Sequence, residues 1–520
     1  MSSTSAVQVP AKDIRKIIIA SSVGTLIEWY DFYIFGSLAT VIAGQFFPKS
    51  NPTAGLLSVL ATFAAGFVVR PFGALVFGRL GDLIGRKYTF LLTLVIMGGS
   101  TFAIGLVPGY QRIGFMAPLL VVLLRLLQGL ALGGEYGGAA TYVAEHSPAH
   151  RRGFFTSWIQ ATATLGLLIS LGVILITRYA LDADHATSIE KFNDWGWRIP
   201  FLISILLVAV SVYIRLKMQE SPLFSRLKTE GKLSVNPLKE SFGRKPNLKI
   251  VLLALFGATM GQGVVFYTGQ FYAQSFLENV CKMDFDQGKT MLLIAIALAT
   301  PFFILFGGWS DRVGRKWIMM AGMLLAILTY PFLFGQLLRI PATEGRTELT
   351  DQKEIRSTVA FVGKSRDLVR TTSTLTHYEG GLLITETNKD TVYASGKTAG
   401  KPVTAMTRTV GTADYWKMIG VLFIMVFYVT MVYGPIAAFL VELFPTRIRY
   451  TSLSLPYHIG NGVFGGMTPF IATLLTTIYT GNKLVGLWYP IGVAAVCLVI
   501  GVLYIPGRKG GGHQLALEEK

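Results

Sequence analysis

Five ionisable side chains stand inside long apolar runs of this sequence, where charged residues are rare. They are Glu28, Asp31, Arg70, Arg125 and Glu135. Glu28 and Asp31 are three positions apart and therefore share one face of a helix. Gln128 and Glu135 fall on the same helical stripe as Arg125. We expect these two stripes of opposite charge to face each other across a central cavity; the alternative is a permanent structural ion pair.

A second group of residues could bind a polar solute. On one expected helix Gln262, Phe266, Gln270 and Gln274 recur at four-residue spacing with Tyr267 beside them, and on another His458 and Asn461 lie one turn apart. Hydrogen-bonding groups among apolar walls are typical of ligand sites, but the same residue types also join helices to each other. Both interpretations stay open. The candidate solute-binding residues are Tyr30, Arg70, Gln128, Gln262, Tyr267, Gln270, His458 and Asn461.

The composition indicates that membrane-spanning helices position these residues. The 520 residues are 52% apolar and only 15% charged, against about 25% charged in soluble domains. A spanning helix needs about 20 mainly apolar residues. The sequence predicts an all-α membrane protein with twelve spans: 17–46, 55–80, 88–108, 117–144, 154–178, 198–218, 249–277, 289–310, 317–338, 416–440, 451–480 and 485–506. Glycines at 129, 133 and 137 predict close packing of the fourth span.

The basic residues give the expected orientation. The net charge is +18, and most of the basic loops fall on one side of the predicted spans, as the positive-inside rule requires of cytoplasmic loops. Both termini are therefore expected in the cytoplasm. The first apolar stretch is long and contains Glu28 and Asp31, so we expect no cleavable signal peptide. Cys281 lies near the outer end of the seventh span and Cys497 lies within the twelfth, so neither a disulfide nor a metal site is expected.

An internal repeat divides the chain. GRLGDLIGRK begins at Gly78, and its pattern of G, three residues, D, two residues, G, R, K returns from Gly307. A second echo pairs Glu145, with its following proline and arginine, with Glu442. Six helices are thus followed by six in the same orientation, a parallel repeat. We expect an N-terminal half at 1–218, a cytoplasmic linker at 219–248, a C-terminal half at 249–506 and a cytoplasmic tail at 507–520.

The two echoes differ in offset by about 68 residues, which indicates an insertion in the second half. It falls at 339–415, between the ninth and tenth spans, and topology places it on the outer face. Runs of alternating residues at 358–362 and 382–387 favour a small β-rich cap. The polar, Thr- and Gly-rich composition is equally compatible with a disordered loop.

The repeated loop motif resembles the signature of the major facilitator superfamily. GTLIEWYDFYIFG from Gly24, RLLQGLALGGEYGG from Arg125 and ELFPTRIRYTSLSLPYHIGNG from Glu442 are similar to the metabolite:proton symporter family. That family includes carriers of 2-oxoglutarate, citrate, shikimate and proline or betaine. The resemblance covers nearly all of the chain outside the insertion. It implies the major facilitator fold and proton-coupled symport of a small polar metabolite in the bacterial inner membrane.

The resemblance also implies roles for individual residues. Asp31 and Arg125 match the proton-coupling pair of sugar-proton symporters, with Glu28 and Glu135 as rival acids. Burial favours a neutral carboxyl group, whereas a neighbouring guanidinium favours the charged form, so movement of the arginine could switch proton affinity. A cytoplasmic ion network that holds the halves together maps onto Asp82, Arg86, Glu145, Glu220, Asp311, Arg315 and Glu442.

No enzyme or nucleotide-binding motif is present: the sequence contains no Walker loop and no His or Cys cluster with metal-ligand spacing. We expect no cofactor and no nucleic-acid partner, only a metabolite, protons and the lipid bilayer, with the monomer as the working unit. The alternatives are an uncoupled facilitator, a sodium-coupled carrier and a transporter-like sensor. Fold-level analogy alone does not decide among them.

Overall fold

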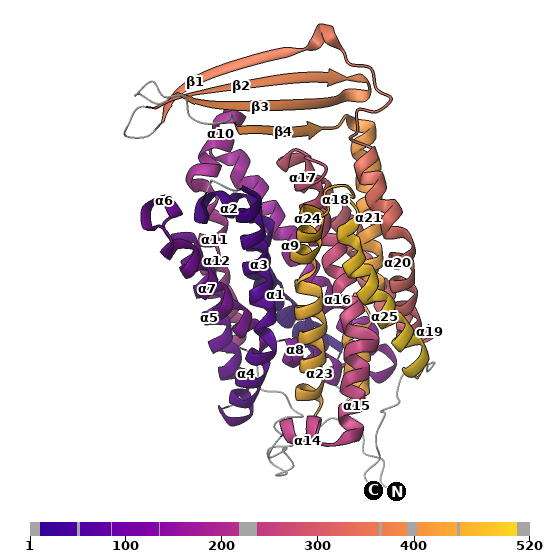
Figure 1. The fold of residues 1–520 in the computed structure, drawn as a ribbon. Helices are drawn as coiled ribbons and strands as arrows, with labels where there is room; N and C mark the ends of the chain where they lie inside the picture. The colour runs from indigo at the N-terminus through magenta and orange to yellow at the C-terminus, as the bar shows by residue number, and fades with distance from the viewer. Residues whose placement is uncertain are drawn as a thin grey trace, which may run out of the picture.

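The structure is a computed structural model that describes residues 11–48, 52–84, 86–134, 136–217, 237–362, 367–392, 403–444 and 448–506. A body of helices stands beneath one small β-sheet (Figure 1). Helices before residue 218 gather on one side of the body and those after residue 236 on the other. We call these groups the first and second halves. The two ends of the body are the sheet end and the opposite end, where α14 (Pro237–Gly243) lies.

The first half consists of apolar helices whose longest members are long enough to cross a membrane. They are α1 (Ala11–Ser37), α2 (Ala39–Phe46), α3 (Pro52–Val68), α4 (Arg70–Ile84), α5 (Arg86–Leu106), α6 (Tyr110–Ile113), α7 (Met116–Gly133), α8 (Tyr136–His146), α9 (Arg152–Ala180), α10 (His185–Lys191), α11 (Arg198–Leu202) and α12 (Ser204–Lys217). Two runs are bent, by 63° between α1 and α2 and by 49° where α11 begins.

The second half repeats this pattern with more interruptions. Its helices after α14 are α15 (Lys245–Ala254), α16 (Met260–Tyr267), α17 (Ala273–Asn279), α18 (Phe285–Ala299), α19 (Pro301–Val313), α20 (Arg315–Arg339), α21 (Thr412–Tyr433), α22 (Ile436–Leu443), α23 (Arg449–Tyr457), α24 (Thr468–Ile478) and α25 (Trp488–Tyr504). Short π-helical segments join several of them: η3 (Leu255–Thr259), η4 (Thr268–Tyr272) and η7 (His458–Gly465). Such segments are frequent at functional sites.

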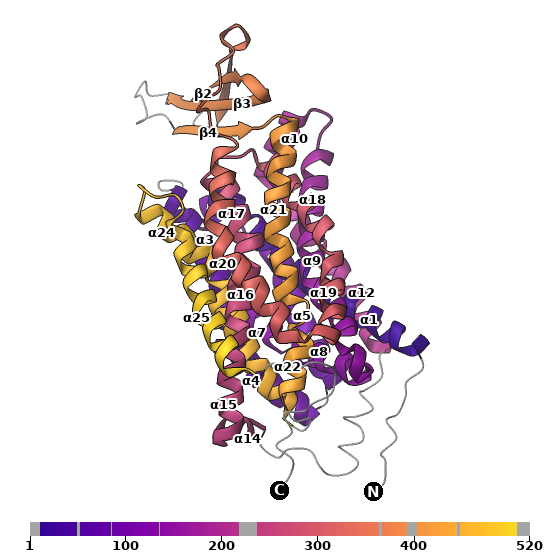
Figure 2. The ribbon, with the colours of Figure 1, turned by 90° about the vertical axis from the view of Figure 1, so that its right-hand side faces the viewer.

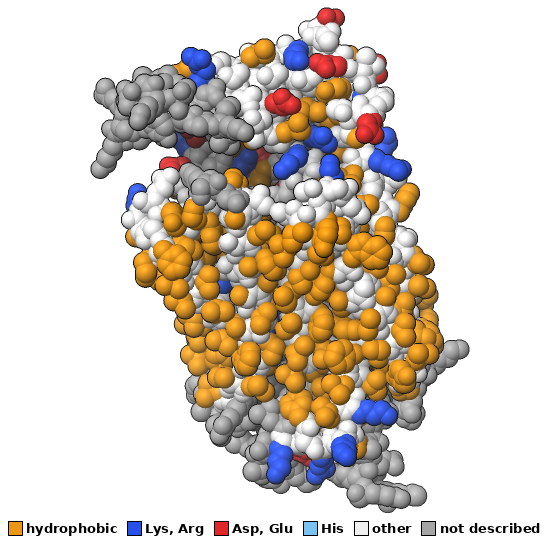
Figure 3. Space-filling view, in the orientation of Figure 1, with side chains coloured by type: hydrophobic (Ala, Val, Ile, Leu, Met, Phe, Trp, Pro, Cys, Tyr) orange, Lys and Arg blue, Asp and Glu red, His pale blue; other side chains and the backbone are white. Residues whose placement is uncertain are grey.

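The described helices form eight candidate membrane spans, or ten if each bent pair counts as one. The other two expected spans correspond to α5, whose apolar stretch Leu91–Leu106 is shorter, and to the broken run α23–η7–α24. Twelve spans therefore stay a prediction. Figure 3 shows the physical basis of the membrane assignment on the face in view, a broad belt of apolar side chains across the body with charged side chains gathered at its two ends.

The two copies of the loop motif occupy matching junctions. The first connects α4 to α5 and the second connects α19 to α20. At the second junction Gly314 adopts a φ of 104°, in the left-handed region that favours glycine. The glycine in the motif is therefore what lets the chain leave α19 and start α20 without a longer loop.

Glycines bring the fourth expected span against the second, as the four-residue spacing predicts. A Cβ added to Gly129 would lie 1.9 Å from the carbonyl oxygen of Gly66, and one added to Gly133 would lie 2.1 Å from that of Arg70. No larger side chain fits at either position. The close-packing role predicted for these two glycines is confirmed, and α7 is held directly against the backbone that carries Arg70.

The segment between α20 and α21 forms the sheet. Its four antiparallel strands follow chain order: β1 (Glu354–Val362), β2 (Asp367–Tyr378), β3 (Leu382–Val392) and β4 (Val403–Thr409). Their many Thr and Val residues suit the pleated conformation. Between β2 and β3, Gly380 and Gly381 have φ values of 79° and 76°, and they make the tight turn. The region expected as either a cap or a loop is thus a sheet in this structure.

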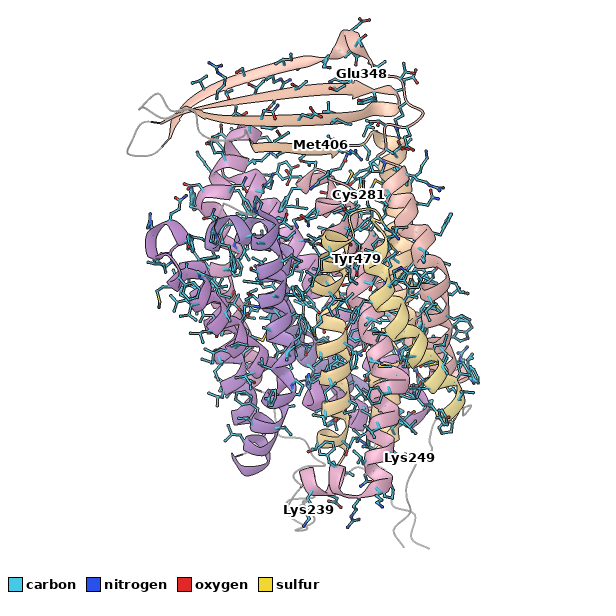
Figure 4. The ribbon with its side chains drawn as sticks, in the orientation of Figure 1. Lys239, Lys249, Cys281, Glu348, Met406 and Tyr479 are labelled. Atoms are coloured by element: carbon cyan, nitrogen blue, oxygen red, sulfur yellow. The ribbon has the colours of Figure 1, made fainter. Side chains whose placement is uncertain are left out.

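The sheet is joined to the helices through the connection between α17 and α18. The amide of Arg408 in β4 donates to the Lys282 carbonyl (2.7 Å), and the amide of Asp284 donates to the Arg408 carbonyl (2.8 Å). The Gln287 side chain donates to the Val410 carbonyl and accepts from its amide, at 2.8 and 2.9 Å. Figure 2 shows the sheet above the helices, and Figure 4 shows Met406 on its lower strand. A movement of α17 and α18 would therefore displace β4 or break these hydrogen bonds.

Candidate functional site

Arg70, at the start of α4, is a cation buried among aromatic rings in the middle of the helical body. Only 1% of its surface is exposed. Its guanidinium carbon lies 4.0 Å from the centre of the Phe67 ring, 4.5 Å from Phe32 and 5.3 Å from Trp29. These are cation–π distances, and the attraction grows when the partners are desolvated, as here. Its side chain also reaches the second half, since its Cδ lies 3.7 Å from a Cβ built at Gly462.

Arg125, on α7, is fully buried and also contacts Phe32, with its guanidinium carbon 4.1 Å from the centre of that ring. Its Nη1 donates to the Gln128 side chain at 2.6 Å and to the Phe32 carbonyl at 3.2 Å. Gln128 in turn donates to the Thr101 hydroxyl at 2.6 Å. The predicted stripe on this helix thus exists, and Gln128 orients Arg125.

Asp31 points away from Arg125. It is fully buried, and both carboxylate oxygens are without a hydrogen-bond partner among the described residues. One oxygen lies 3.3 Å from a Cβ built at Gly98 on α5, so the side chain faces the interior of the first half. The structure therefore does not bring Asp31 and Arg125 into an ion pair within 4.0 Å. Their coupling stays a prediction about another step of a transport cycle.

Three further candidates remain: Glu28 and Tyr30 on the first expected span and Glu135 on the fourth. Glu28 is buried at 2% exposure. Tyr30 turns away from the central arginines, because its hydroxyl donates to the Pro200 carbonyl at 2.7 Å and so ties α1 to α11. Glu135 lies outside the described residues.

A chain of polar side chains from the second half meets the first half beside Arg70. The hydroxyls of Tyr433 and Tyr457 are 2.7 Å apart, and Asn461 donates to Tyr457 at 2.9 Å. Gln262 donates to Asn461 at 3.5 Å. The ring of Tyr457 stacks on Tyr136 of the first half, with centroids 3.4 Å apart. Two of the predicted solute-binding residues, Gln262 and Asn461, are therefore brought together.

His458 and Tyr267 join the same cluster with unused polar groups. The His458 ring lies edge-on to Tyr136 and Tyr457, and neither of its nitrogens has a hydrogen-bond partner among the described residues. The Tyr267 ring packs edge-on against Phe67 at 4.9 Å, and its hydroxyl is likewise without a partner in the described part of the chain.

The other glutamines of the seventh span bridge the halves in this conformation. Gln270 donates to Thr164 on α9 at 3.1 Å. Gln274 donates to the Ser37 carbonyl at the end of α1, at 3.2 Å. The interhelical interpretation of these amides thus describes their present contacts, and a role in solute binding requires that these contacts open.

At the opposite end, a carboxylate of the second half caps a helix of the first half. Asp311 accepts hydrogen bonds from the backbone amides of Gly153 and Phe154, at 2.8 and 3.0 Å. These amides belong to the first turn of α9, where unpaired donors and the helix dipole favour a negative charge. Arg315 lies between Asp311 (3.0 Å) and Glu442, to which it donates twice at 2.6 Å.

Glu442 also lies 3.5 Å from Arg152, which precedes the capped amides. Three of the seven predicted gate residues, Asp311, Arg315 and Glu442, therefore form one cross-half network, which we call the latch. Asp82, Arg86 and Glu145 lie on α4, α5 and α8, but their side chains are outside the described part of the structure, and Glu220 lies outside the described residues.

Buried charged side chains also link the two halves at the sheet end. Lys289 of α18 is fully buried and donates to Glu278 at 2.8 Å and to the Ser37 carbonyl of α1 at 2.6 Å. Arg178 at the end of α9 pairs with Asp286 at 2.6 Å. Their sequence positions did not single out any of these four charged residues, because all four fall at or just outside the ends of predicted spans, where charge is ordinary.

A small pocket opens beside this sheet-end closure. Its volume of about 20 Å³ leaves room for about one water molecule. Its lining comes from both halves and includes Thr40, Phe63, Phe271, Gln274 and Glu278. The rings of Phe63 and Phe271, with centroids 5.4 Å apart, both line it.

Comparison with known proteins identifies the family. Residues 16–232 match a family described as sugar (and other) transporter. The chain is 30% identical over 484 residues to the inner membrane metabolite transport protein YhjE of Escherichia coli, covering 92% of this chain and 91% of that protein. The chain belongs to the major facilitator superfamily. A putative metabolite transport protein of Haemophilus influenzae is 32% identical over 508 residues, covering 95% of each chain. This chain is a multi-pass membrane transporter and not an enzyme.

Relatives with named solutes are more distant or shorter in their overlap. The alpha-ketoglutarate permease of Escherichia coli is 29% identical over 499 residues, covering 96% of this chain and 95% of that protein. Among solved structures, the xylose transporter XylE from E. coli, in a partially occluded inward open conformation, has a TM-score of 0.63 at 16% identity. The match covers 97% of this chain and 100% of that chain. At this identity the match supports the fold of this major facilitator protein and carries no argument about its solute or its coupling ion.

Proposed function

We propose that this transporter is a proton-coupled symporter that moves a small polar metabolite, an organic acid or a zwitterion, by alternating access of its two halves. The observation that carries the proposal is the arrangement at the boundary between the halves. Buried polar and ionisable side chains lie along it. At the sheet end the halves are joined by the Arg178–Asp286 ion pair and by the hydrogen bond from Lys289 to the Ser37 carbonyl. At the opposite end they are joined by Asp311, which accepts from the first amides of α9, and by the Arg152–Glu442 pair. A carrier needs a central site and two closures that open in turn.

Proton coupling is supported by Asp31. A buried carboxylate without a hydrogen-bond donor is costly when charged, so this position suits a group that gains and loses a proton as its surroundings change. Names of relatives support the solute class, since they include metabolite transport proteins, a proline/betaine transporter and an alpha-ketoglutarate permease. The expected orientation places the sheet outside and both termini in the cytoplasm of a bacterial cell, with the protein working as a monomer in the inner membrane.

The test is solute-dependent proton movement in sealed proteoliposomes that enclose a pH-sensitive dye. Addition of a transported solute outside should acidify the interior, and a protonophore should abolish solute accumulation. Accumulation that persists with the protonophore but requires a sodium gradient would replace proton coupling by sodium coupling. Equilibration without accumulation under either gradient would identify an uncoupled facilitator.

A further inference from the structure

The buried guanidinium groups of Arg70 and Arg125 have N–H donors that no described residue accepts. The Nε and Nη2 atoms of both Arg70 and Arg125 are buried and have no hydrogen-bond acceptor among the described residues. Neither guanidinium forms an ion pair within the described part of the chain. A buried charge is tolerated when it is paired and hydrogen-bonded, and its unpaired donors strongly favour an acceptor that carries negative charge.

The surroundings of Arg70 add further donors. The hydroxyls of Tyr33 and Tyr267 are buried and without partners in the described residues, and both lie within electrostatic reach of Arg70. A planar guanidinium can hold both oxygens of one carboxylate, and tyrosine hydroxyls can donate to the same oxygens. The donor set therefore fits an oxyanion better than a neutral solute.

The aromatic rings argue against a cationic group at the same place. An aromatic cage often binds a quaternary ammonium group. Here the faces of Phe32, Phe67 and Trp29 are already occupied by the Arg70 guanidinium. An ammonium group beside it would meet a like charge in a desolvated site, and this repulsion opposes the zwitterion alternative.

The sheet-end pocket lies on the route to this centre. Phe63 lines the pocket and also contacts Arg125, whose guanidinium carbon is 5.2 Å from the ring centre. Phe271 lines it too and packs on Tyr33 at 4.7 Å. The nearest carboxylate on that path, Glu278, is neutralised by Lys289 at 2.8 Å. Displacement of the two rings would connect the pocket to the arginines.

We propose that the solute is an organic anion, and that Arg70 binds one of its carboxylates together with the hydroxyls of Tyr33 and Tyr267 while Arg125 supplies the second positive charge. The inference rests on the proposed transport function and narrows its solute class from organic acid or zwitterion to a net anion. The sheet-end pocket, behind Phe63 and Phe271, is the entrance to this site.

The experiment measures thermal stabilisation and equilibrium binding of the purified full chain. The probes are succinate, citrate, lactate, the neutral diamide succinamide, glycine betaine, proline and xylose. We expect one or more of the carboxylate anions to raise the Tm, and betaine, proline, xylose and succinamide to leave it unchanged. Arg70→Lys keeps the charge but loses the planar fork, and Tyr267→Phe removes one hydroxyl donor. Each should weaken anion binding by about tenfold or more.

The matched control is Arg112→Gln, which removes an exposed cation on α6 and should leave anion binding unchanged. Stabilisation by betaine, proline or xylose but by no anion would overturn the anion proposal and leave the transport function intact. Failure of every carboxylate, or anion binding that is unaffected by both Arg70→Lys and Tyr267→Phe, would overturn it as well. Anion binding without any uptake in proteoliposomes would instead remove the proposed transport function, so the two failures are distinguishable.

Discussion

At the scale of single residues, the important contrast is between the buried carboxylate of Asp31 and the two buried guanidinium groups. Arg125 is held by Gln128 and the Phe32 carbonyl, whereas Asp31 faces α5. Consecutive side chains on a helix point about 100° apart, so a helix that presents Phe32 to Arg125 turns Asp31 elsewhere. Rotation or sliding of α1 against α7 would be needed to bring the two charges together.

Asp31→Asn is predicted to abolish uphill uptake while retaining solute binding and exchange. Asparagine has nearly the same volume but cannot exchange a proton, so energetic coupling is lost without a cavity. For one proton per solute, a gradient of one pH unit supports about tenfold accumulation, and the variant should reach a ratio of about one. Uptake and counterflow in proteoliposomes measure both properties.

The exposed carboxylate of Asp184, which caps the short helix α10, provides a control for Asp31. Asp184→Asn should accumulate solute like the unchanged protein. Tenfold accumulation by Asp31→Asn under the imposed gradient would remove Asp31 from the coupling mechanism and move the role to Glu28 or Glu135.

Sequence could identify the ionisable residues of the centre but not their partners. The rarity of charge in apolar runs was sufficient to single out Arg70, Arg125 and Asp31. Contacts depend on the rotation of each helix about its axis, which periodicity does not give. Hence only the structure shows that Arg125 donates to Gln128 and that the Tyr30 hydroxyl donates to the Pro200 carbonyl. It is also the structure that shows aromatic rings around Arg70.

At the scale of helices, the latch joins the two halves through one cap. Asp311 of α19 accepts hydrogen bonds from the first amides of α9, and Arg315 donates to the same carboxylate. A Cβ built at Gly153 would lie 2.4 Å from the Gly307 carbonyl, so the two helices also touch through their backbones. Opening this end must break the cap before the helices can separate.

Asp311→Asn and Arg315→Ala are predicted to reduce transport more than solute binding. Each weakens the closure by about 1–2 kcal/mol, the usual contribution of a helix cap or of one charged hydrogen bond. The equilibrium between the two conformations should shift by roughly 5- to 30-fold toward the one that is open at the latch. Transport rate and solute affinity, measured on the same preparations, separate this effect from a direct role in binding.

Arg312→Ala is the matched control for the latch, because Arg312 is adjacent but exposed. It should transport normally. An equal loss of rate and affinity in Asp311→Asn would contradict the latch and indicate damage to the fold or to the central site.

The sheet makes a separate prediction at the same scale. Gln287 bonds both backbone groups of Val410, directly after β4. Gln287→Ala removes both bonds, each of which contributes about 0.5–1.5 kcal/mol net. Hydrogen exchange of the β4 amides should therefore accelerate by about 5-fold or more. The control Thr290→Ala removes only a hydrogen bond to the Asp286 carbonyl within α18 and should leave exchange of the β4 amides unchanged. Unchanged exchange in Gln287→Ala would contradict the prediction and indicate that the sheet is anchored elsewhere.

Element by element, the repeat and the apolar runs predicted the helices well, and the insertion less so. Alternation marked parts of β1 and β3, but the attachment of β4 to residues 282–284 joins segments more than 120 residues apart. Local patterns carry no information about such a pairing. The π-helical breaks around α16 and in η7 were also invisible, since they arise where packing, not propensity, sets the backbone.

At the scale of the whole molecule, the belt of apolar side chains in Figure 3 fixes the direction of the membrane but not which end faces outward. Orientation rests on the distribution of basic residues, a sequence argument. Ser357 on β1 at the sheet end and Lys239 on α14 at the opposite end are both exposed, and Figure 4 marks Lys239. The natural cysteines Cys281 and Cys497 are free and buried, so they contribute little background.

We predict that Ser357→Cys reacts with a membrane-impermeant maleimide in spheroplasts, whereas Lys239→Cys reacts only after lysis. The reason is that loops rich in arginine and lysine are retained in the cytoplasm during insertion, and the sheet stands at the other end of the body. Because both positions are exposed, a difference in labelling reports sidedness and not burial. Labelling of Lys239→Cys in intact spheroplasts, with Ser357→Cys protected until lysis, would show that the protein has the opposite orientation in the membrane. The sheet-end pocket would then be the cytoplasmic entrance, and the latch at Asp311 the outer closure.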